Sequence, residues 1–404
     1  MTSRTTARPL LVLASTYPAS VGDGTPSFVR DLAVGLVGSF APRLLVPAVP
    51  GGSASEDADG LHVTRYRFFP RRWEDVADGA ILENVRSRRS RLVQLPFLMA
   101  AQWWGVRREV RQHRPDVIHA HWIIPQGLVA RVAAPRIPLV VTTLGGDLYA
   151  LNDPISRALK RFVLRHASVV TVMNEDMRVR AIALGSDPDA TRVLPMGAQV
   201  AQFADAAVGR GGRAVERPIR LLAVGRLVEK KGFHMLLKAL AAIGGDGWHL
   251  TVVGDGPHRA SLERAAESLP VSFVGQLTRD QLTRADAESD VAVFPSVRAA
   301  SGDQDGLPVA LLEAMASGCA VVVSDLPGLA EAVEPEVSGL VVPTGDVAAL
   351  TAALTRLIGD RELTARLGGA AAVRAQRFDV AAVAEAYAVL LDGAASRGPA
   401  GTEN

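Results

Sequence analysis

The sequence predicts an α/β protein made of two doubly wound domains, each a parallel sheet covered by helices on both faces. Short runs rich in Val, Leu and Ile alternate with longer helical patterns along almost the whole chain, which is typical of buried parallel sheets. The alternation stops at residues 204–217, ADAAVGRGGRAVER, which are rich in glycine and charge, and then starts again. At roughly 150 residues per domain, a chain of 404 residues has room for two or three domains.

The first half of the chain is expected to form one Rossmann-like domain over residues 1–203, followed by a linker at 204–217. The expected strands of this domain are 10–14, 62–68, 117–121, 139–143, 169–172 and 193–194. The expected helices are 26–37, 96–112, 155–165 and 174–183.

The second half is expected to form another Rossmann-like domain over residues 218–377. Its expected strands are 219–224, 250–253, 271–274, 291–294 and 320–323. Its expected helices are 233–243, 257–267, 279–287 and 308–317. Two such domains place a ligand in the cleft between them, at the carboxyl ends of the strands. The tail, 393–404, is expected to be disordered.

Composition excludes several classes of protein. Cys319 is the single cysteine, so a disulfide framework and a Cys-rich zinc site are both excluded. No apolar run approaches the roughly 18 residues that span a bilayer. The N-terminus, MTSRTTARPLLVLAS, is followed by Tyr17-Pro18 rather than by a small-residue cleavage site, so it reads as a first strand. We expect a cytoplasmic protein.

Residues 71–114 carry ten arginines against five acidic residues, with Trp73, Phe97, Trp103 and Trp104 among them. One interpretation is a membrane-facing surface that attracts anionic headgroups, with aromatic side chains at the interface. A second is a solvated helix face with its tryptophans in the core. A nucleic-acid groove ranks last, because the segment contains no nucleic-acid-binding motif.

The densest signal for chemistry lies in residues 294–323. A strand ends at Phe294, and Gly306-Leu307-Pro308 opens the next helix, whose free N–H groups and positive dipole end favour an anion. Glu313 lies inside this otherwise apolar helix, where a carboxylate needs a hydrogen-bonding partner. A ribose diol would be one such partner. The alternatives are a backbone group or an arginine.

Three further loops each follow a strand. In VGRLVEKKG (224–232), Arg226 and Lys231 suit the oxygens of a diphosphate. The loop VGDGP (253–257) favours a structural turn. The strand end FVGQL (273–277) could present backbone groups to a flat base.

Together these motifs resemble the retaining GT-B glycosyltransferases of family 4, which combine GR…K–G, VGDGP, an FxG strand end and E-x7-E. The resemblance implies that Arg226 and Lys231 hold the diphosphate of a nucleotide sugar and that Glu313 takes the ribose hydroxyls. The first acid of E-x7-E would contact the donor sugar, and here it is Asp305, one methylene shorter. The positions expected to bind the donor are Gly22, Gly24, Gly225, Arg226, Lys231, Gly254, Gly275, Leu277, Gly306, Leu307, Val309 and Glu313.

The first half resembles the same family. The segment DVIHAHWIIPQG (116–127) is similar to its H-x-H strand end, which implies that His121 lies near the donor sugar and phosphate while His119 supports it. Asp147 and Tyr17 are expected at the acceptor pocket. The helix 378–392 is expected to cross back onto the first domain. The residues expected to take part in transfer are His121, Asp305, Glu313, Arg226 and Lys231.

The predicted function is transfer of a sugar from a UDP- or GDP-linked donor to an acceptor hydroxyl, with retention at the anomeric carbon. No cofactor and no metal are expected, because neither a D-x-D pair nor a His/carboxylate cluster in the loops is identified as a Mg²⁺ or Mn²⁺ site. The acceptor would belong to a glycolipid, a polysaccharide or a glycosylated metabolite, with lipid linkage favoured by the basic segment. Two alternatives stay open: a nucleotide-sugar epimerase of the same architecture, and a nucleotide-sugar binding module without catalysis.

Overall fold

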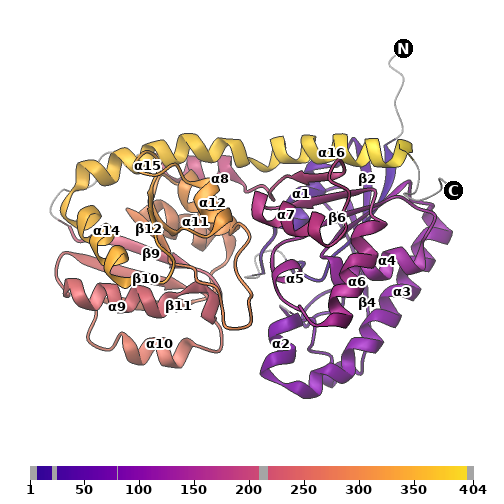
Figure 1. The fold of residues 1–404 in the computed structure, drawn as a ribbon, viewed down its shortest axis with the longest axis horizontal. Coiled ribbons are helices and arrows are strands. Elements are labelled where there is room, and N and C mark those ends of the chain that lie inside the picture. The colour runs from indigo at the N-terminus through magenta and orange to yellow at the C-terminus, as the bar shows by residue number, and fades with distance from the viewer. Residues whose placement is uncertain (1–6, 21–24, 80, 209–216, 398–404) are drawn as a thin grey trace, which may run out of the picture. The chain divides into compact units, whose positions relative to one another are not determined.

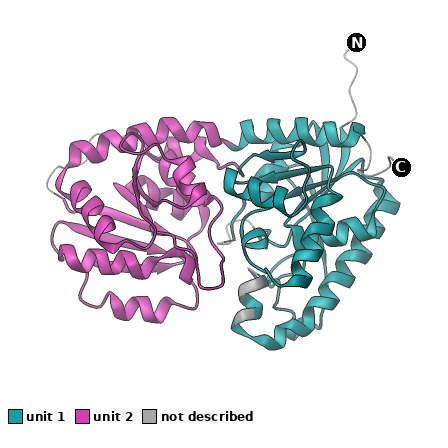
Figure 2. Cartoon of the chain, in the orientation of Figure 1, with its two compact units in different colours: residues 1–196, 380–404 teal, residues 197–379 magenta. Residues whose placement is uncertain are grey.

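The computed structural model describes residues 7–20, 25–79, 81–208 and 217–397, apart from the side chains of residues 82, 83 and 86. The chain forms two compact units, which Figure 2 distinguishes by colour. Unit 1 contains residues 1–196 and 380–404, and unit 2 contains residues 197–379. Each unit is a sheet with helices on both faces (Figure 1), so the predicted α/β class with two doubly wound sheets is confirmed.

The sheet of unit 1 has eight strands in the described residues, in the order β3-β4-β2-β1-β5-β6-β7-β8. All neighbouring strands are parallel except β3 and β4. The strands are β1 (Arg8–Leu13), β2 (Phe40–Pro47), β3 (Ser55–Ala58), β4 (Leu61–Tyr66), β5 (Val117–His121), β6 (Leu139–Thr142), β7 (Val169–Val172) and β8 (Thr191–Val193). The sequence did not predict β2 or β3. In β2, proline and arginine interrupt the apolar pattern, and β3 consists mainly of polar residues.

Helices cover this sheet, and the last of them comes from the C-terminal end of the chain. They are α1 (Phe28–Gly35), α2 (Ile81–Ser87), α3 (Gln94–His113), α4 (Leu128–Ala133), α5 (Gly146–Tyr149), α6 (Pro154–Arg165), α7 (Glu175–Ala183) and α16 (Val380–Arg397). The predicted return of the last helix to the first domain is therefore confirmed. It runs to Arg397, so residues 393–397 are helical rather than disordered, and Ala394 packs in the core.

Tyr387 fixes α16 to the sheet of unit 1. Its hydroxyl lies 3.0 Å from Thr171 Oγ1 and 3.3 Å from Thr142 Oγ1, and it donates to the carbonyl oxygen of Leu194 at 3.2 Å. Burial raises the pKa of Tyr387 to about 12, so the hydroxyl keeps its proton and can donate at neutral pH.

The sheet of unit 2 has six parallel strands in the described residues, in the order β11-β10-β9-β12-β13-β14. The strands are β9 (Ile219–Val224), β10 (Trp248–Val253), β11 (Val271–Gly275), β12 (Val291–Phe294), β13 (Ala320–Ser324) and β14 (Leu340–Val342). The helices are α8 (Val200–Ala206), α9 (Phe233–Ile243), α10 (Arg259–Ala265), α11 (Arg279–Glu288), α12 (Val309–Ala316), α13 (Pro327–Ala332), α14 (Val347–Gly359) and α15 (Arg361–Ala375).

Alternate residues of β9 face two separate cores. Leu221 and Ala223 pack in a cluster with residues of α9, α10 and α14. Leu222 and Val224 pack in the other cluster with residues of α8, α12 and α15. Both faces of this strand are therefore apolar, as the uninterrupted run of Leu, Ala and Val predicts. Helix α8 belongs to unit 2 by this packing, so the unit begins at residue 197, before the linker expected at 204–217. Residues 209–216 of that linker lie outside the described part of the chain.

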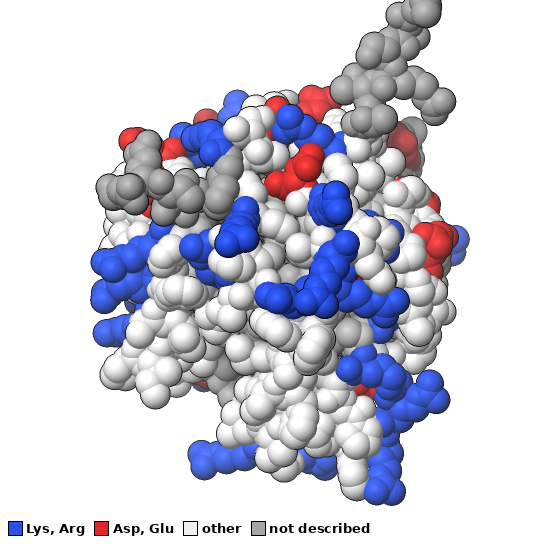
Figure 3. Space-filling model, turned by 90° about the vertical axis from the view of Figure 1, so that its right-hand side faces the viewer, with Lys and Arg blue, Asp and Glu red and all other residues white. Residues whose placement is uncertain are grey.

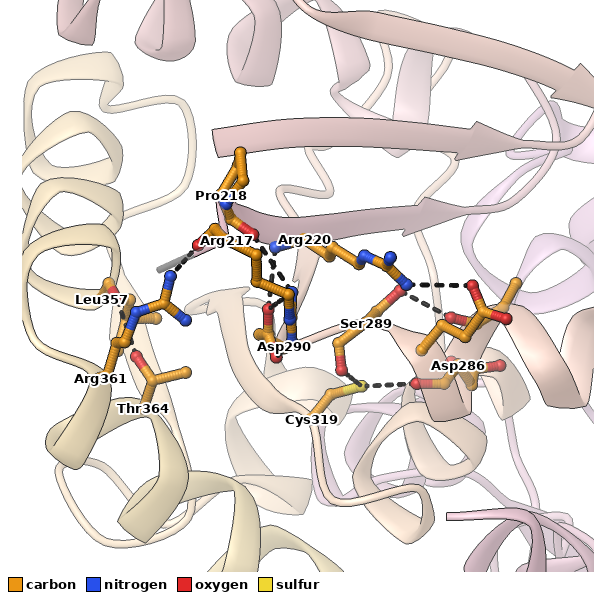
Figure 4. Close-up of polar contacts among 12 residues, drawn as sticks. Arg217, Pro218, Arg220, Asp286, Ser289, Asp290, Cys319, Leu357, Arg361 and Thr364 are labelled. Atoms are coloured by element: carbon orange, nitrogen blue, oxygen red, sulfur yellow. Dashed lines mark hydrogen bonds and ion pairs between the residues drawn. The ribbon is translucent and has the colours of Figure 1, made fainter. Parts of the chain in front are cut away.

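Polar contacts hold the amino ends of β9, β12 and β13 together (Figure 4). The guanidinium of Arg217 donates to both carboxylate oxygens of Asp290, at 2.8 and 2.6 Å. The same carboxylate accepts from the backbone N–H of Arg220 at 2.9 Å. The Cys319 thiol donates to the carbonyl oxygens of Asp286 and Ser289. This end of the sheet is therefore a structural anchor, and the single cysteine is buried within it.

We expect Tyr387→Phe to lower the free energy of unfolding by about 1–3 kcal/mol, because it removes a buried hydroxyl and leaves its partners unsatisfied. Urea unfolding of the full chain measures the loss. Tyr66→Phe is the matched control, since the buried Tyr66 hydroxyl has no hydrogen-bond partner among the described residues. Equal stability changes in the two variants would show that the Tyr387 hydroxyl contributes nothing specific.

Candidate functional site

Backbone contacts that require glycine bring the loops after β9, β10 and β12 together in unit 2. Gly232 has a φ of 65°, and a Cβ there would lie 1.9 Å from the carbonyl oxygen of Pro295. Gly254 has a φ of 125°, and a Cβ there would lie 2.1 Å from the carbonyl oxygen of Gly225. No side chain fits at either position. The loop VGDGP therefore has the structural role favoured from the sequence.

Two lysines and two aspartates meet where these loops touch. The Lys231 ammonium lies 2.8 Å from Asp305 Oδ2, which also accepts from the Ser296 hydroxyl at 2.8 Å. The Lys230 ammonium lies 3.2 Å from Asp303 Oδ2. Burial alone would raise the pKa of Asp305, but the two lysine charges and the hydrogen bonds from Lys231 and Ser296 hold it below its ordinary value. Asp305 is therefore an ionised carboxylate at neutral pH.

Sequence reasoning overlooked part of this cluster. Asp303 and Asp305 form an Asp-x-Asp pair, which is visible in the sequence as DQD. Asp303 is buried, and its Oδ1 has no hydrogen-bond partner among the described residues. The sequence predicts that Lys231 pairs with a diphosphate. In the structure, Lys231 already forms an ion pair with Asp305. With Lys230 included, two cations face two carboxylates, so the cluster is formally neutral.

The remaining predicted donor residues follow strand ends or open α12. Arg226 is half-buried directly after β9. Gly275 closes β11, and its carbonyl accepts from the N–H of Gly254 at 2.7 Å. Helix α12 begins at Val309 with Pro308 at its N-cap, and no side chain caps it. Gly306 and Leu307 lie just before this helix start, as the sequence predicts.

Glu313 is buried in α12 and has an arginine beside it. Arg279 Nη1, from the first residue of α11, lies 3.3 Å from Glu313 Oε1. The structure therefore contains the arginine pairing considered from the sequence. The ribose role of Glu313 stays a prediction, and a ribose would share the carboxylate with Arg279.

In unit 1, His119 and His121 lie on the same face of β5, as strand alternation predicts, with their ring centroids 4.3 Å apart. Both are buried. Burial lowers the pKa of His119 to about 3, and burial together with His119 lowers the pKa of His121 well below its ordinary value. His119 Nε2 lies 2.7 Å from Thr142 Oγ1. The Nδ1 of His121 has no hydrogen-bond partner among the described residues. His121 is thus a buried neutral group, and its place near the donor sugar stays a prediction.

Asp147 organises the loops after β5 and β6. Its carboxylate accepts from the Ile123 N–H at 2.8 Å, the Thr143 hydroxyl at 2.8 Å and the Leu144 N–H at 3.2 Å. Burial raises the pKa of Asp147 even though these hydrogen bonds oppose the shift. The three contacts are structural, and an acceptor contact of Asp147 stays a prediction.

Tyr17, the other predicted acceptor residue, is buried just after β1. The guanidinium carbon of Arg65 lies 5.6 Å from its ring centroid. Burial, with Glu56 as the next cause, raises the pKa of Tyr17 to about 12, so the phenol stays neutral. Gly22 and Gly24 lie outside the described residues.

Sequence reasoning also missed Lys160. It is fully buried in α6 and donates to the carbonyl oxygens of Leu148, at 3.0 Å, and of Ala150. Burial lowers its pKa to about 8. A lysine in an amphipathic helix normally indicates solvated surface, so the sequence gives no signal for this contact.

Two family models match the chain, one on each side of the linker. "Glycosyl transferase 4-like domain" matches residues 23–197, and "Glycosyl transferases group 1" matches residues 218–360. A glycogen synthase of Mycobacterium tuberculosis is 30% identical over 297 residues, 69% of each chain. The chain belongs to the group 1 glycosyltransferases of family 4 type.

Other members of the family match over different lengths. A GDP-mannose-dependent alpha-(1-6)-phosphatidylinositol monomannoside mannosyltransferase of M. tuberculosis is 28% identical over 381 residues, 89% of this chain and 92% of that one. The amylovoran biosynthesis glycosyltransferase AmsK of Erwinia amylovora is 36% identical over 184 residues, but the match spans only 44% of each chain.

Solved structures agree on the fold of this glycosyltransferase. Sucrose-phosphate synthase of Thermosynechococcus elongatus aligns with a TM-score of 0.77 at 22% identity, over 96% of this chain and all of that one. Anabaena Alr3699/HepE in complex with UDP-glucose aligns with a TM-score of 0.70 at 21% identity, over 95% and 99% of the two chains. The predicted GT-B class is confirmed. Across the described ranges, no helix is long and apolar enough to cross a bilayer, and no group of three His, Cys, Asp or Glu side chains could hold a metal ion.

The two buried histidines predict a loss of stability in mild acid. The unfolded chain takes up a proton near pH 6.5 at each histidine, whereas burial lowers the pKa of folded His119 to about 3 and lowers the pKa of folded His121 well below its ordinary value. Stability should therefore fall as the pH drops below about 6.5, by about 1.4 kcal/mol for His119 at pH 5.5 relative to pH 7.5, with a further loss in the same direction from His121. Urea unfolding at both pH values measures the difference.

His119→Gln should remove one histidine's share of this pH dependence, whatever it does to the absolute stability. His113→Gln, which changes an exposed histidine of α3, is the matched control. If His119→Gln leaves the pH dependence unchanged, then His119 accepts a proton in the folded state and its assignment as a neutral group is wrong.

Proposed function

We propose that this glycosyltransferase moves a sugar from a UDP- or GDP-linked donor to an acceptor hydroxyl, with retention at the anomeric carbon. The observation that carries the proposal is the cation cluster after β9, together with the uncapped start of α12 and the buried carboxylate of Glu313. Cations and free N–H groups suit a diphosphate, and a carboxylate suits a ribose diol. The names of relatives and neighbours include GDP-mannose and UDP-glucose, and for this chain the choice of nucleotide belongs to the proposal.

In the proposed mechanism, the donor diphosphate replaces Asp305 as the principal partner of Lys231. Arg226 and Lys231 then stabilise the charge that develops on the leaving group, with the dipole of α12 as a third contribution. The leaving phosphate oxygen helps to deprotonate the acceptor, so no enzyme nucleophile takes part. His121 contributes as a neutral hydrogen-bonding group, since its lowered pKa keeps the imidazole uncharged at neutral pH.

We further propose that transfer needs neither a cofactor nor a metal, and that the acceptor hydroxyl belongs to a glycolipid, a polysaccharide or a glycosylated metabolite. A cytoplasmic location at the inner face of a membrane would bring a nucleotide sugar and a lipid-linked hydroxyl within reach of the same protein. A relative named for phosphatidylinositol monomannoside supports a lipid-linked acceptor by analogy.

A nucleotide-sugar binding module without catalysis is the second candidate, because Asp305 is shorter than the usual glutamate and is already paired with Lys231. A thermal-shift panel of nucleotide diphosphates and their sugars identifies the donor first, since a bound ligand stabilises the folded chain. Incubation with that donor, with and without acceptors, then separates the functions. A transferase releases nucleotide diphosphate with an acceptor, an epimerase converts the donor alone, and a binding module does neither.

Glu313→Ala should weaken binding of the nucleotide-sugar donor by about 1.5–3 kcal/mol, the value of a charged hydrogen bond to the ribose. This corresponds to roughly 10- to 150-fold in Kd by calorimetry. Arg279→Ala is the control, because it removes one ion-pair partner of Glu313 and keeps the carboxylate itself. Unchanged donor affinity in folded Glu313→Ala would show that the ribose assignment is wrong.

Activity should survive excess EDTA, while Arg226→Ala and Lys231→Ala should each lose at least about 100-fold in kcat, the scale of removing one such stabilising group. Arg220→Ala, at the amino end of β9, is the matched control and should keep its activity. Release of nucleotide diphosphate measures the activity of the wild type in EDTA and of each of the variants. Complete loss of activity in EDTA that Mg²⁺ or Mn²⁺ restores would instead assign Asp303 and Asp305 to a metal.

A further inference from the structure

Large apolar side chains are exposed in one segment of unit 1. Trp73, Leu92, Val93, Phe97 and Trp104 are each between 49% and 66% exposed. Contacts hold the segment together: the rings of Phe69 and Phe97 have centroids 5.4 Å apart, and Gln94 accepts from the N–H of Val76 at 3.2 Å. Trp73 and Trp104 are therefore not core residues, which contradicts the part of the second interpretation that places the tryptophans in the core.

Helix α3 has two distinct faces. One face is exposed. Its residues are spaced by three, four or seven positions, which places them on the same side of a helix: Val93, Phe97, Trp104, Arg108 and Arg111. Gln94, Leu98, Gln102, Val106 and Glu109 are buried on the opposite face. The exposed face is thus apolar toward its N-terminal end and basic toward its C-terminal end. We call the exposed side chains of residues 71–114 the α3 surface.

Three of the five acids in residues 71–114 are paired with arginines of the protein. Buried Glu74 lies 2.6 Å from Arg67, buried Glu109 lies 2.8 Å from Arg43, and Asp75 lies 2.7 Å from Arg91. Among the described side chains of this surface, one acid, Asp78, is exposed. The exposed arginines are Arg71, Arg72, Arg88, Arg89, Arg108, Arg111 and Arg114. The side of Figure 1 on which α3 lies faces the viewer in Figure 3, and Lys and Arg far outnumber Asp and Glu on it.

We propose that the α3 surface docks on the anionic surface of a lipid bilayer. Arginines attract anionic headgroups, and the exposed tryptophans, Phe97 and the aliphatic pair Leu92 and Val93 can enter the interfacial layer. A nucleic acid would use the arginines but offers these aliphatic side chains no apolar phase. The proposal deepens the proposed function and rests on it in one respect only: the docked protein would take its acceptor hydroxyl from a lipid.

Vesicle sedimentation measures membrane binding and involves no sugar transfer. The docking proposal can therefore fail while the proposed function stands, and the proposed function can fail while the docking proposal stands. The full chain should sediment with vesicles of equal parts phosphatidylglycerol and phosphatidylcholine, and much less with phosphatidylcholine alone. Binding should weaken as the salt concentration rises. The double variant Arg108→Gln/Arg111→Gln should bind anionic vesicles roughly 25-fold more weakly, about five-fold for each charge removed. Trp104→Gln should weaken binding as well.

Arg264→Gln/Arg284→Gln is the matched control, since it removes two exposed charges from unit 2, and it should bind as the wild type does. Circular dichroism confirms that each variant is folded. Negligible binding of the wild type to both vesicles, equal binding to both, or equal losses in the two double variants would each overturn the proposal. Binding to duplex DNA but not to anionic vesicles would overturn it in favour of a nucleic-acid surface.

Discussion

The close approach of Gly232 to the carbonyl oxygen of Pro295 is the constraint on which the donor side of unit 2 depends. It places the turn Glu229–Lys231 directly against the loop after β12, where the N–H of Val297 donates to the carbonyl of Lys230 at 2.8 Å. The Glu229 carboxylate adds a contact to the N–H of Ala300 at 3.0 Å. Any Cβ at residue 232 would push the two loops apart and would separate Lys231 from Asp305.

The cluster that results is a set of buried charges, and its energetics follow from that burial. An ion pair taken out of water gains little net stability, because desolvation offsets the attraction. Removing one partner costs far more, since a buried charge is then left uncompensated. Asp305 would not be left without a partner if Lys231 moved away, because Lys230 lies 3.7 Å from it and the Ser296 hydroxyl donates to it. Lys231 can therefore turn toward an incoming phosphate without leaving Asp305 unpaired.

The parts of the fold that local sequence determines were predictable. Apolar runs predicted most of the central strands, and glycines and proline predicted the loops at their carboxyl ends. As a result, the predicted positions relative to the strands and to α12 are correct for Arg226, Gly254, Gly306 and Glu313. The shorter or interrupted elements were not predictable: β14 has three residues, and α15 contains Gly368 and Gly369, which weaken a helical pattern.

Contacts between distant residues were equally invisible in the sequence. Lys231 and Asp305 are 74 residues apart, and Tyr387 and Thr171 are 216 apart. No local pattern indicates such pairs. The Asp-x-Asp pair was visible, yet the sequence alone does not say whether lysines or a metal ion satisfy its carboxylates.

Charge counting over a segment illustrates the same limit. The sequence gives residues 71–114 a moderate excess of arginine, but the structure shows that two of the acids behind that figure, Glu74 and Glu109, are buried against arginines from outside the segment. These two acids are neutralised inside the protein, whereas most of the described arginines of the segment are exposed. The surface is consequently more basic than the composition suggests. The reverse holds in unit 2, where lysines next to each other in the sequence look like solvated charge but are paired with buried aspartates. What an ionisable residue can do for a ligand or a membrane is therefore set by its burial and its partners, and these depend on which strands and helices the fold makes neighbours.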